Sequence, residues 1–292
     1  MQTIILVAET GADIPRELVE RYHIHIVPMH VSFGDITKED GTFPSEEICS
    51  YYERTGHLPK TSCSTPEDFI AAFDSIHAQF PEAQILYLAY SAATTASYQS
   101  AQIAAEGRDY VTSVDTKSVS AGQCAVVLRM AQLLEAHPEW DVAQAARVAE
   151  KLTRQIRMCF IPNDMEYLRA GGRVSNAVAL CGKLLGIHPL IEIQGGRLLA
   201  TKKLRGKLSK LAPALVTSYT LDNNMCKEEL WMIRSPGLPD TIVTSAEEAA
   251  RSLGFEKITW IKTGGVITTH GGPSAFGVAG FSTTGRISDR EN

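Results

Sequence analysis

The sequence predicts an α/β protein in which a Rossmann-like N-terminal domain with a parallel sheet precedes a second, α+β domain with an antiparallel sheet. Over about the first 155 residues, short apolar runs rich in β-branched residues alternate four times with helical patterns, as in helix-covered parallel sheets. Hairpin and short-helix patterns replace this alternation afterwards. The length of 292 residues also exceeds what one hydrophobic core usually supports. We therefore expect domains at residues 1–157 and 158–292.

The predicted parallel sheet has four strands, and a helix follows each of them. The strands are expected at residues 3–8, 25–33, 85–89 and 110–114. The helices are expected to begin at Pro15, near Pro44, after the hydroxyl-rich run 61–65, at residue 98, at a cap formed by Ser120, and at a cap formed by Asp141. The last of these helices is expected to run to about Arg157.

The second half is organised around residues 160–206. Asn163 and Asp164 are good caps for a short helix that Gly171-Gly172 ends, and Ser175 or Asn176 can cap an apolar helix at 178–186. Residues 188–193 and 197–204 are predicted to form a hairpin through Gly195-Gly196. Further predicted elements are a helix at 208–219, a strand at 229–234, a helix capped by Thr244 or Ser245, and strands at 257–262, 266–269 and 276–281.

Composition excludes several classes of function. The net charge of −5 gives no overall basic surface, so we expect no nucleic-acid partner. No apolar run reaches eighteen residues, so we expect no integral membrane span. The start of the chain lacks the features of a signal peptide, and the six cysteines are scattered without a C-x-x-C pair. We expect a cytoplasmic protein with reduced cysteines and no metal site.

The polar groups at strand ends are better suited to binding an anion than to catalysing the cleavage of a bond. The sequence contains no G-x-x-x-x-G-K-[ST] loop, no G-x-G-x-x-G and no H-E-x-x-H. It does place hydroxyl-rich loops between strand ends and helix starts, where open α/β sheets bind ligands. Taken singly, each hydroxyl is more often a helix cap, His270 a loop or core residue, and each of Arg173 and Arg205 a surface cation.

Seven motifs in a fixed order carry a resemblance to a known family. They are E-T-G-A-D-I-P at 9–15, K-T-S-C-S-T-P at 60–66, S-A-A-T-T-A-S-Y-Q-S-A at 91–101, V-D-T-K-S-V-S-A-G at 114–122, E-Y-L-R-A-G-G-R-V-S at 166–175, K-L-R-G at 203–206 and T-H-G-G-P-S-A at 269–275. In this order and spacing the chain resembles the DegV family of bacterial fatty-acid-binding proteins over nearly its whole length.

The resemblance implies a carrier that binds a long-chain fatty acid between its two domains, without a cofactor. It implies that Thr61, Ser91 and His270 hold the carboxylate, with Ser62 and Thr95 close by. Arg173 is implied to lie near that carboxylate, and Arg205 to belong to the surface that meets a separate fatty acid kinase subunit. That kinase would make acyl phosphate for phospholipid synthesis.

The chain departs from the family pattern at some of these motifs, and other functions stay open. Ala92 replaces a second serine, and Thr95-Ala96-Ser97 replaces S-G-T. One alternative is a hydrolase or phosphotransferase with Ser91 or Thr61 as nucleophile and His270 as base. Another is a structural or regulatory module whose pocket is incidental.

Overall fold

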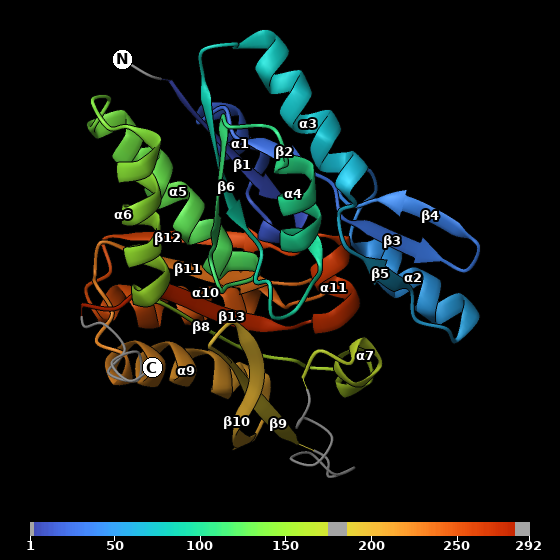
Figure 1. Ribbon diagram of the computed structural model, residues 1–292. Helices are drawn as coiled ribbons and strands as arrows, with labels where there is room; N and C mark the ends of the chain where they lie inside the picture. The colour runs from blue at the N-terminus through green and yellow to red at the C-terminus, as the bar shows by residue number, and fades with distance from the viewer. Residues whose placement is uncertain (1–2, 175–185, 284–292) are drawn as a thin grey trace.

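The structure, a computed structural model, describes residues 3–174 and 186–283. Its first sheet is parallel and has the strand order β2-β1-β6-β7 (Figure 1). The strands are β1 (Ile4–Glu9), β2 (His25–Val27), β6 (Gln84–Ala89) and β7 (Val111–Asp115). The predicted parallel N-terminal sheet is therefore confirmed.

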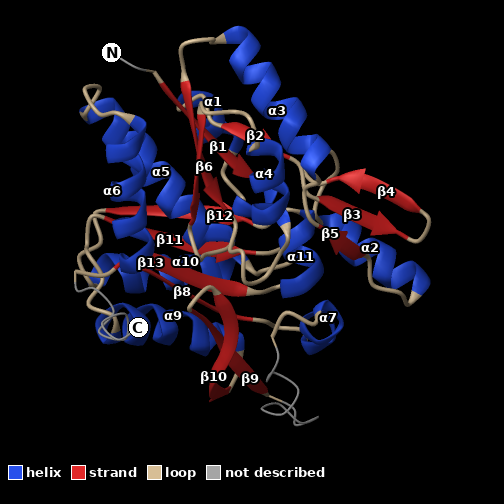
Figure 2. Ribbon diagram, in the orientation of Figure 1, coloured by secondary structure: helices blue, strands red, loops and turns tan. Residues whose placement is uncertain are grey.

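A second sheet has six strands in the order β10-β9-β8-β13-β11-β12 (Figure 2). They are β8 (Ile156–Ile161), β9 (Ile187–Gln194), β10 (Arg197–Arg205), β11 (Glu229–Arg234), β12 (Lys257–Lys262) and β13 (Phe276–Phe281). Neighbouring strands are antiparallel, apart from the parallel pair β11 and β12. The hairpin of β9 and β10 turns through Gly195 and Gly196, which both have positive φ, as predicted.

A third, small antiparallel sheet was not predicted as such. It has the order β4-β3-β5 and consists of β3 (His30–Phe33), β4 (Ile36–Glu39) and β5 (Lys60–Ser62). The sequence analysis treated residues 25–33 as one strand, which is wrong, because β2 and β3 belong to different sheets. Pro28 lies between them and has no amide hydrogen with which to continue a ladder.

Helices separate and cover the two large sheets. They are η1 (Thr10–Ala12), α1 (Arg16–Arg21), α2 (Glu46–Thr55), α3 (Pro66–Gln79), α4 (Ser97–Ala105), α5 (Ser120–Ala136), α6 (Val142–Gln155), α7 (Met165–Gly171), α9 (Leu208–Asp222), α10 (Asp240–Ser252) and α11 (Gly265–Gly271). The helices α3 and α4 pack on one face of the parallel sheet, and α5 and α6 pack on the other. The helices α9 and α10 cover the far face of the six-stranded sheet.

Helix α5 lies between the two large sheets. Its residues from Ser120 to Leu128, and Met130 and Ala131, are buried. The hydrophobic cluster around it contains Leu86 and Leu88 of the parallel sheet together with Met158 and Trp231 of the six-stranded sheet. A helix that is buried on most sides needs a mostly apolar surface, and the run AGQCAVVLRMA provides it apart from Gln123 and Arg129. The amide nitrogen of the buried Gln123 donates hydrogen bonds to Glu9 and to the carbonyl oxygen of Leu88. Both sheets therefore share one core.

Several predicted boundaries change for physical reasons. Ser120 is the first residue of α5 rather than its cap: Val119 precedes the helix in extended conformation, and the Ser120 hydroxyl donates to Asp13. Helix α10 begins at Asp240, so Thr244 and Ser245 lie inside it. Helix α6 ends at Gln155, and β8, which was not predicted, begins at Ile156.

The division into domains after residue 157 stays a prediction. The predicted cap at Ser175 or Asn176 lies outside the described residues, as does almost all of the predicted helix 178–186.

Residues 266–269 were predicted as a strand, but they lie in helix α11. Their β-branched side chains favour a strand locally. Two distant carboxylates override this preference: Asp13 accepts the amide hydrogen of Gly264 at 2.7 Å, and Asp40 accepts that of Gly265 at 2.7 Å. These bonds satisfy the amides that a helix start leaves unpaired, and negative charge there is favoured by the helix dipole.

Candidate ligand-binding site

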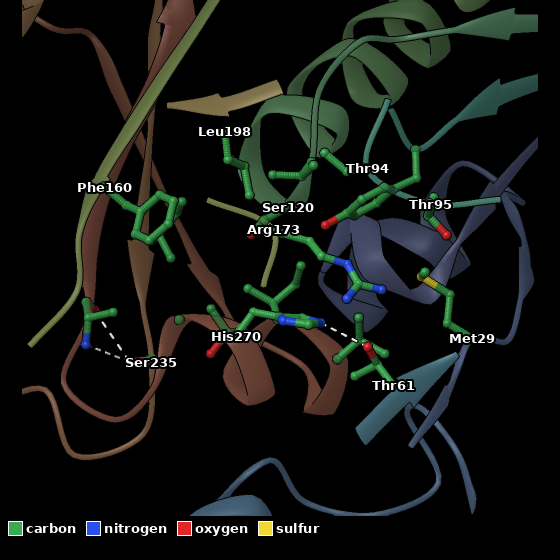
Figure 3. Close-up of a pocket in the computed structure, with 18 of the residues that line it drawn as sticks. Met29, Thr61, Thr94, Thr95, Ser120, Phe160, Arg173, Leu198, Ser235 and His270 are labelled. Atoms are coloured by element: carbon green, nitrogen blue, oxygen red, sulfur yellow. Dashed lines mark hydrogen bonds between the residues drawn. The ribbon is translucent and has the colours of Figure 1, made fainter. Parts of the chain in front are cut away.

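A cavity lies where the loops of the parallel sheet, the six-stranded sheet and α11 meet (Figure 3). It encloses about 790 Å³ of space, part of which opens to solvent. Much of its wall is apolar, with Met158 and Phe160 from β8, Leu198 from β10 and Ile233 from β11. Figure 3 shows Phe160 and Leu198 on the side away from Thr61 and Thr95. The cavity thus has an apolar part and a polar part.

The polar part is built around Thr61 and His270. Thr61 lies on β5, which pairs with β3, and His270 lies on α11. The Thr61 Oγ1 and the His270 Nε2 are 2.8 Å apart, although 209 residues separate them in sequence. Both side chains line the cavity. The structure therefore brings together two of the three residues that were predicted to hold a carboxylate.

Helix α11 places His270, and its own position is set by both halves of the chain. It packs against α7, α2, β3, β5 and η1. Asp13 and Asp40 hold its first amides, and burial is the main reason that the pKa of each carboxyl is raised. The Ser120 hydroxyl also donates to Asp13. The predicted sites did not include Asp13 or Asp40, since nothing local in the sequence shows that they cap a helix more than 220 residues away.

His270 is neutral near pH 7. Burial lowers its pKa to about 4, and the positive charge of Arg173 acts in the same direction. Its Nδ1 atom is buried and has no hydrogen-bond partner among the residues that the structure describes. On that side the ring lies against Gly171, where an added Cβ would be 2.3 Å from Nδ1. Only glycine leaves room for the ring there.

Arg173 is exposed and lines the cavity, with its guanidinium drawn between His270 and Thr95 in Figure 3. Its Nη1 donates a 2.9 Å hydrogen bond to the carbonyl oxygen of Gly171, at the end of α7. Arg173, Thr94 and Thr95 line the cavity and also a more open basin beside it, whose wall includes Ala92, Ala93, Ala96, Gln99 and Gln102. A charged group bound near Thr61 would therefore lie close to this guanidinium and to solvent.

The other predicted hydroxyls have different surroundings. Ser62 is exposed and lines the cavity, and Thr95 lines it while its Oγ1 lies 3.3 Å from the Ser97 hydroxyl. Thr94, which was not predicted as a site residue, also lines the cavity, but it donates to the carbonyl oxygen of Ser91. Its place in the run S-A-A-T-T-A-S is the signal that could have identified it.

Ser91 differs from the other predicted ligands, because it is buried away from the cavity wall. Its hydroxyl donates a 2.7 Å hydrogen bond to the carbonyl oxygen of Gly196, in the turn of the β9–β10 hairpin. A Cβ on Gly196 would lie 2.6 Å from the Ser91 Oγ. This geometry favours a structural role for Ser91, and its predicted contact with a carboxylate stays untested.

Arg205 has a different position from the other predicted site residues. It is the last residue of β10 and is exposed, paired in register with Ile187. It does not line the cavity. Its predicted role at a partner surface is a separate question from ligand binding.

The site is suited to holding an anion with an apolar tail. Hydroxyl groups, a neutral imidazole and one guanidinium surround the polar part, and hydrocarbon side chains surround the rest. Within residues 3–174 and 186–283, no group of three or more histidine, cysteine or acidic side chains is placed to hold a metal ion. In the same ranges, no helix has the length and apolar character needed to cross a membrane.

Comparison with known proteins agrees with this geometry. A family model described as an uncharacterised protein of the DegV family matches residues 3–283. The chain belongs to the DegV family. A DegV domain-containing protein from Deinococcus radiodurans is 30% identical over 285 residues, which cover 95% of this chain and 98% of that protein.

Two other similar proteins are named for a ligand. A fatty acid-binding protein from Thermotoga maritima is 29% identical over 290 residues, covering 95% of this chain and 96% of the relative. A solved structure described as the fatty acid binding of a DegV family protein from Thermus thermophilus has a TM-score of 0.86 and 27% identity. It covers 96% of this chain and 100% of the other. These names describe binding and not a reaction.

Proposed function

We propose that this DegV protein binds a long-chain fatty acid, with its alkyl chain in the apolar part of the cavity and its carboxylate at the Thr61–His270 end. The observation that carries the proposal is this pairing of Thr61 and His270 at the polar end of a largely apolar cavity. Family membership and the ligand named for the relatives from Thermotoga maritima and Thermus thermophilus support it.

The energetics favour such a ligand. Burial of each methylene group is worth roughly 0.8 kcal/mol, so a long chain gains on the order of 10 kcal/mol before the losses of association. The carboxylate loses water on binding, and hydrogen bonds must replace it. We assign this role to Thr61, with Ser62, Thr95 and Arg173 close by, and we assign Ser91 to the scaffold.

We also propose that the bound carboxylate is presented to a separate fatty acid kinase, which forms acyl phosphate for phospholipid synthesis. The basin that shares Thr94, Thr95 and Arg173 with the cavity gives the carboxylate end a route to solvent. Arg205 is the proposed contact with that kinase. A fatty acid held by neutral hydroxyls rather than by a tight ion pair stays reactive toward such a partner.

The direct test is the identity of the lipid that accompanies the purified protein. Denaturing extraction followed by mass spectrometry is expected to release about one fatty acid per chain. Protein that carries no acyl chain, and whose thermal stability does not rise when palmitate is added, would contradict the proposal.

The alternative with a specific observation in its favour is a hydrolase or phosphotransferase. The 2.8 Å contact between Thr61 and His270 is the spacing of a nucleophile and its base. Hydrolysis of an ester or phosphoester by the protein alone, together with labelling of Thr61 by a nucleophile-directed probe, would support this alternative.

A further inference from the structure

We propose that His270 carries its ring proton on Nε2 and donates it to Thr61, and that Gly171 enforces this arrangement. The Thr61 hydroxyl is then left to donate its own proton to the ligand. His270 thereby acts as a positioning residue, and Thr61 is the group that contacts the carboxylate. The identity of that ligand rests on the proposed function, whereas the position of the proton is a property of the protein alone.

The contact between Gly171 and the imidazole selects the protonated nitrogen. A Cβ on Gly171 would lie 2.3 Å from the His270 Nδ1, so the hydrogen that occupies this direction in glycine points at that nitrogen. A nitrogen lone pair accepts such a C–H group as a weak hydrogen bond. An N–H group in the same place would instead direct one hydrogen against another.

Hydrogen bonding leads to the same assignment. The Nδ1 atom is buried and lacks a partner among residues 3–174 and 186–283. A proton on it would be a buried donor without an acceptor, which is unfavourable. A proton on Nε2 has an acceptor, because the Thr61 Oγ1 lies 2.8 Å away. The neutral ring has one proton to place, and only Nε2 offers it a hydrogen bond.

The direction of the Thr61 hydroxyl follows from this assignment. A hydroxyl group has one proton and two lone pairs. If His270 donates to Thr61, the threonine proton is available to an acceptor in the cavity, as a carboxylate requires. In the opposite tautomer Thr61 would donate to His270 and would present only lone pairs to the carboxylate. The assigned tautomer also leaves Nε2 unable to take the Thr61 proton, which counts against Thr61 as an activated nucleophile.

Gly171 thus links two parts of the site. Its hydrogen faces His270, and its carbonyl oxygen accepts the hydrogen bond from Arg173. The last turn of α7 therefore sets both the imidazole and the guanidinium. Neither contact can be deduced from the spacing of these residues in the sequence.

The first experiment locates the proton in lipid-free protein. In protein with ¹⁵N-labelled histidine, two-bond ¹⁵N–¹H correlation spectra distinguish the Nε2–H tautomer from the Nδ1–H tautomer. The His270 signals are assigned by their loss in the His270→Gln variant. We expect a protonated Nε2 and an unprotonated Nδ1. The opposite pattern, or a mixture of the two, would overturn the proposal.

The second experiment perturbs Gly171 and measures palmitate affinity. Gly171→Ala is expected to displace the imidazole, to change its NMR signature and to weaken binding by about tenfold or more, since it leaves buried polar groups without partners. The matched control is Gly172→Asn. Gly172 has a φ of +63° and open space around its Cβ position, which asparagine tolerates. The control should bind within about twofold of wild type.

The outcomes separate the two proposals. A Gly171→Ala variant that keeps both the wild-type signature and the wild-type affinity contradicts the role of Gly171. Wild-type protein with a protonated Nε2 but no affinity for palmitate confirms the tautomer and contradicts the proposed ligand. If Gly171→Ala does not fold, the spectrum of the wild-type protein still decides where the proton lies.

Discussion

The hydroxyl of Ser91 donates a 2.7 Å hydrogen bond to the carbonyl oxygen of Gly196, and this bond joins the loop after β6 to the turn of the β9–β10 hairpin. The two residues are 105 positions apart in the sequence. The contact depends on the absence of a side chain at Gly196, where a Cβ would lie 2.6 Å from the serine oxygen.

Gly196→Ala should therefore destabilise the protein more than Gly195→Ala does. Both glycines have positive φ, but nothing lies within 4 Å of the Cβ position at Gly195. The free energy of unfolding of Gly196→Ala should be lower than that of Gly195→Ala by about 1–2 kcal/mol, because only Gly196→Ala breaks the Ser91 bond. Urea denaturation measures the difference, and equal losses in the two variants would contradict this account.

Asp40→Asn should make the free energy of unfolding less dependent on pH. The pKa of Asp40 is raised above its ordinary value of 3.8, chiefly by burial. The folded state then holds a proton that the unfolded state has lost, so this group reduces stability as the pH rises above about 4 towards its folded pKa. Asparagine keeps an oxygen for the Gly265 amide and does not ionise.

The measurement is the difference in unfolding free energy between Asp40→Asn and wild type from pH 4 to 7. As the pH rises, the unfolding free energy of the variant should increase relative to that of wild type, by at most about 1.4 kcal/mol per pH unit. Asp35→Asn, an exposed change in the neighbouring β3–β4 turn, is the control. Parallel curves for Asp40→Asn and wild type would show that Asp40 titrates alike in both states.

His270→Gln should have the opposite dependence on pH. The pKa of His270 falls from an ordinary 6.5 to about 4, because burial and then Arg173 disfavour the charged ring. The unfolded state therefore binds a proton below pH 6.5 that the folded state refuses, and this contribution to stability is lost as the pH falls from 6.5 to 4. As the pH falls from 6.5 to 4, the unfolding free energy of the glutamine variant, measured by urea denaturation, should therefore rise relative to that of wild type. A constant difference would show that the imidazole is not held neutral.

Thr61→Val should abolish the hydrogen bond to the ligand while keeping the shape of the side chain. We expect palmitate affinity to fall by about ten- to a hundredfold, the usual loss for a hydrogen bond to a charged group. Thr61→Ser keeps the hydroxyl and should bind within a few-fold of wild type. Isothermal titration of lipid-free protein provides the affinities. A valine variant that bound as tightly as the serine variant would place the carboxylate elsewhere.

Arg205→Ala should separate lipid binding from turnover by the kinase. The side chain is exposed at the end of β10 and does not line the cavity, so the variant should retain its fatty acid. Acyl phosphate formation with the purified kinase should fall by about tenfold or more, as for the loss of a central interface arginine. Arg197→Ala, at the other end of the same strand, is the matched control and should have little effect. Loss of bound lipid from Arg205→Ala would reassign this residue to the ligand site.

The parts of the fold that the sequence predicted well are those set by local pattern. The β-branched run at residues 3–8 and the apolar run at 85–89 mark strands of the parallel sheet, and Asp141 caps α6 through Gln144, as its position before the helical pattern indicates. The hairpin followed from Gly195 and Gly196, since consecutive residues with positive φ specify that turn.

The parts that were missed depend on contacts between distant residues. Helix α11 was predicted as a strand because its capping carboxylates, Asp13 and Asp40, come from the other end of the chain. Strand β8 follows α6 without a glycine or proline to mark the change. The family resemblance grouped Thr61 with His270, and the structure places their side chains 2.8 Å apart, although no local pattern joins them; that they hold a carboxylate stays a prediction. The same grouping included Ser91, whose partner at Gly196 only the fold could reveal.

The position of helix α5 bears on how a ligand reaches the cavity. Because its buried face is shared, a hinge motion that parted the parallel sheet from the six-stranded sheet would expose apolar surface on both. Each 100 Å² of such surface is unfavourable by about 2.5 kcal/mol. Separation of the two sheets about a hinge is therefore an unfavourable way for a ligand to enter the cavity. The alternative route for the ligand is the rim that the cavity shares with the open basin, at Thr94, Thr95 and Arg173.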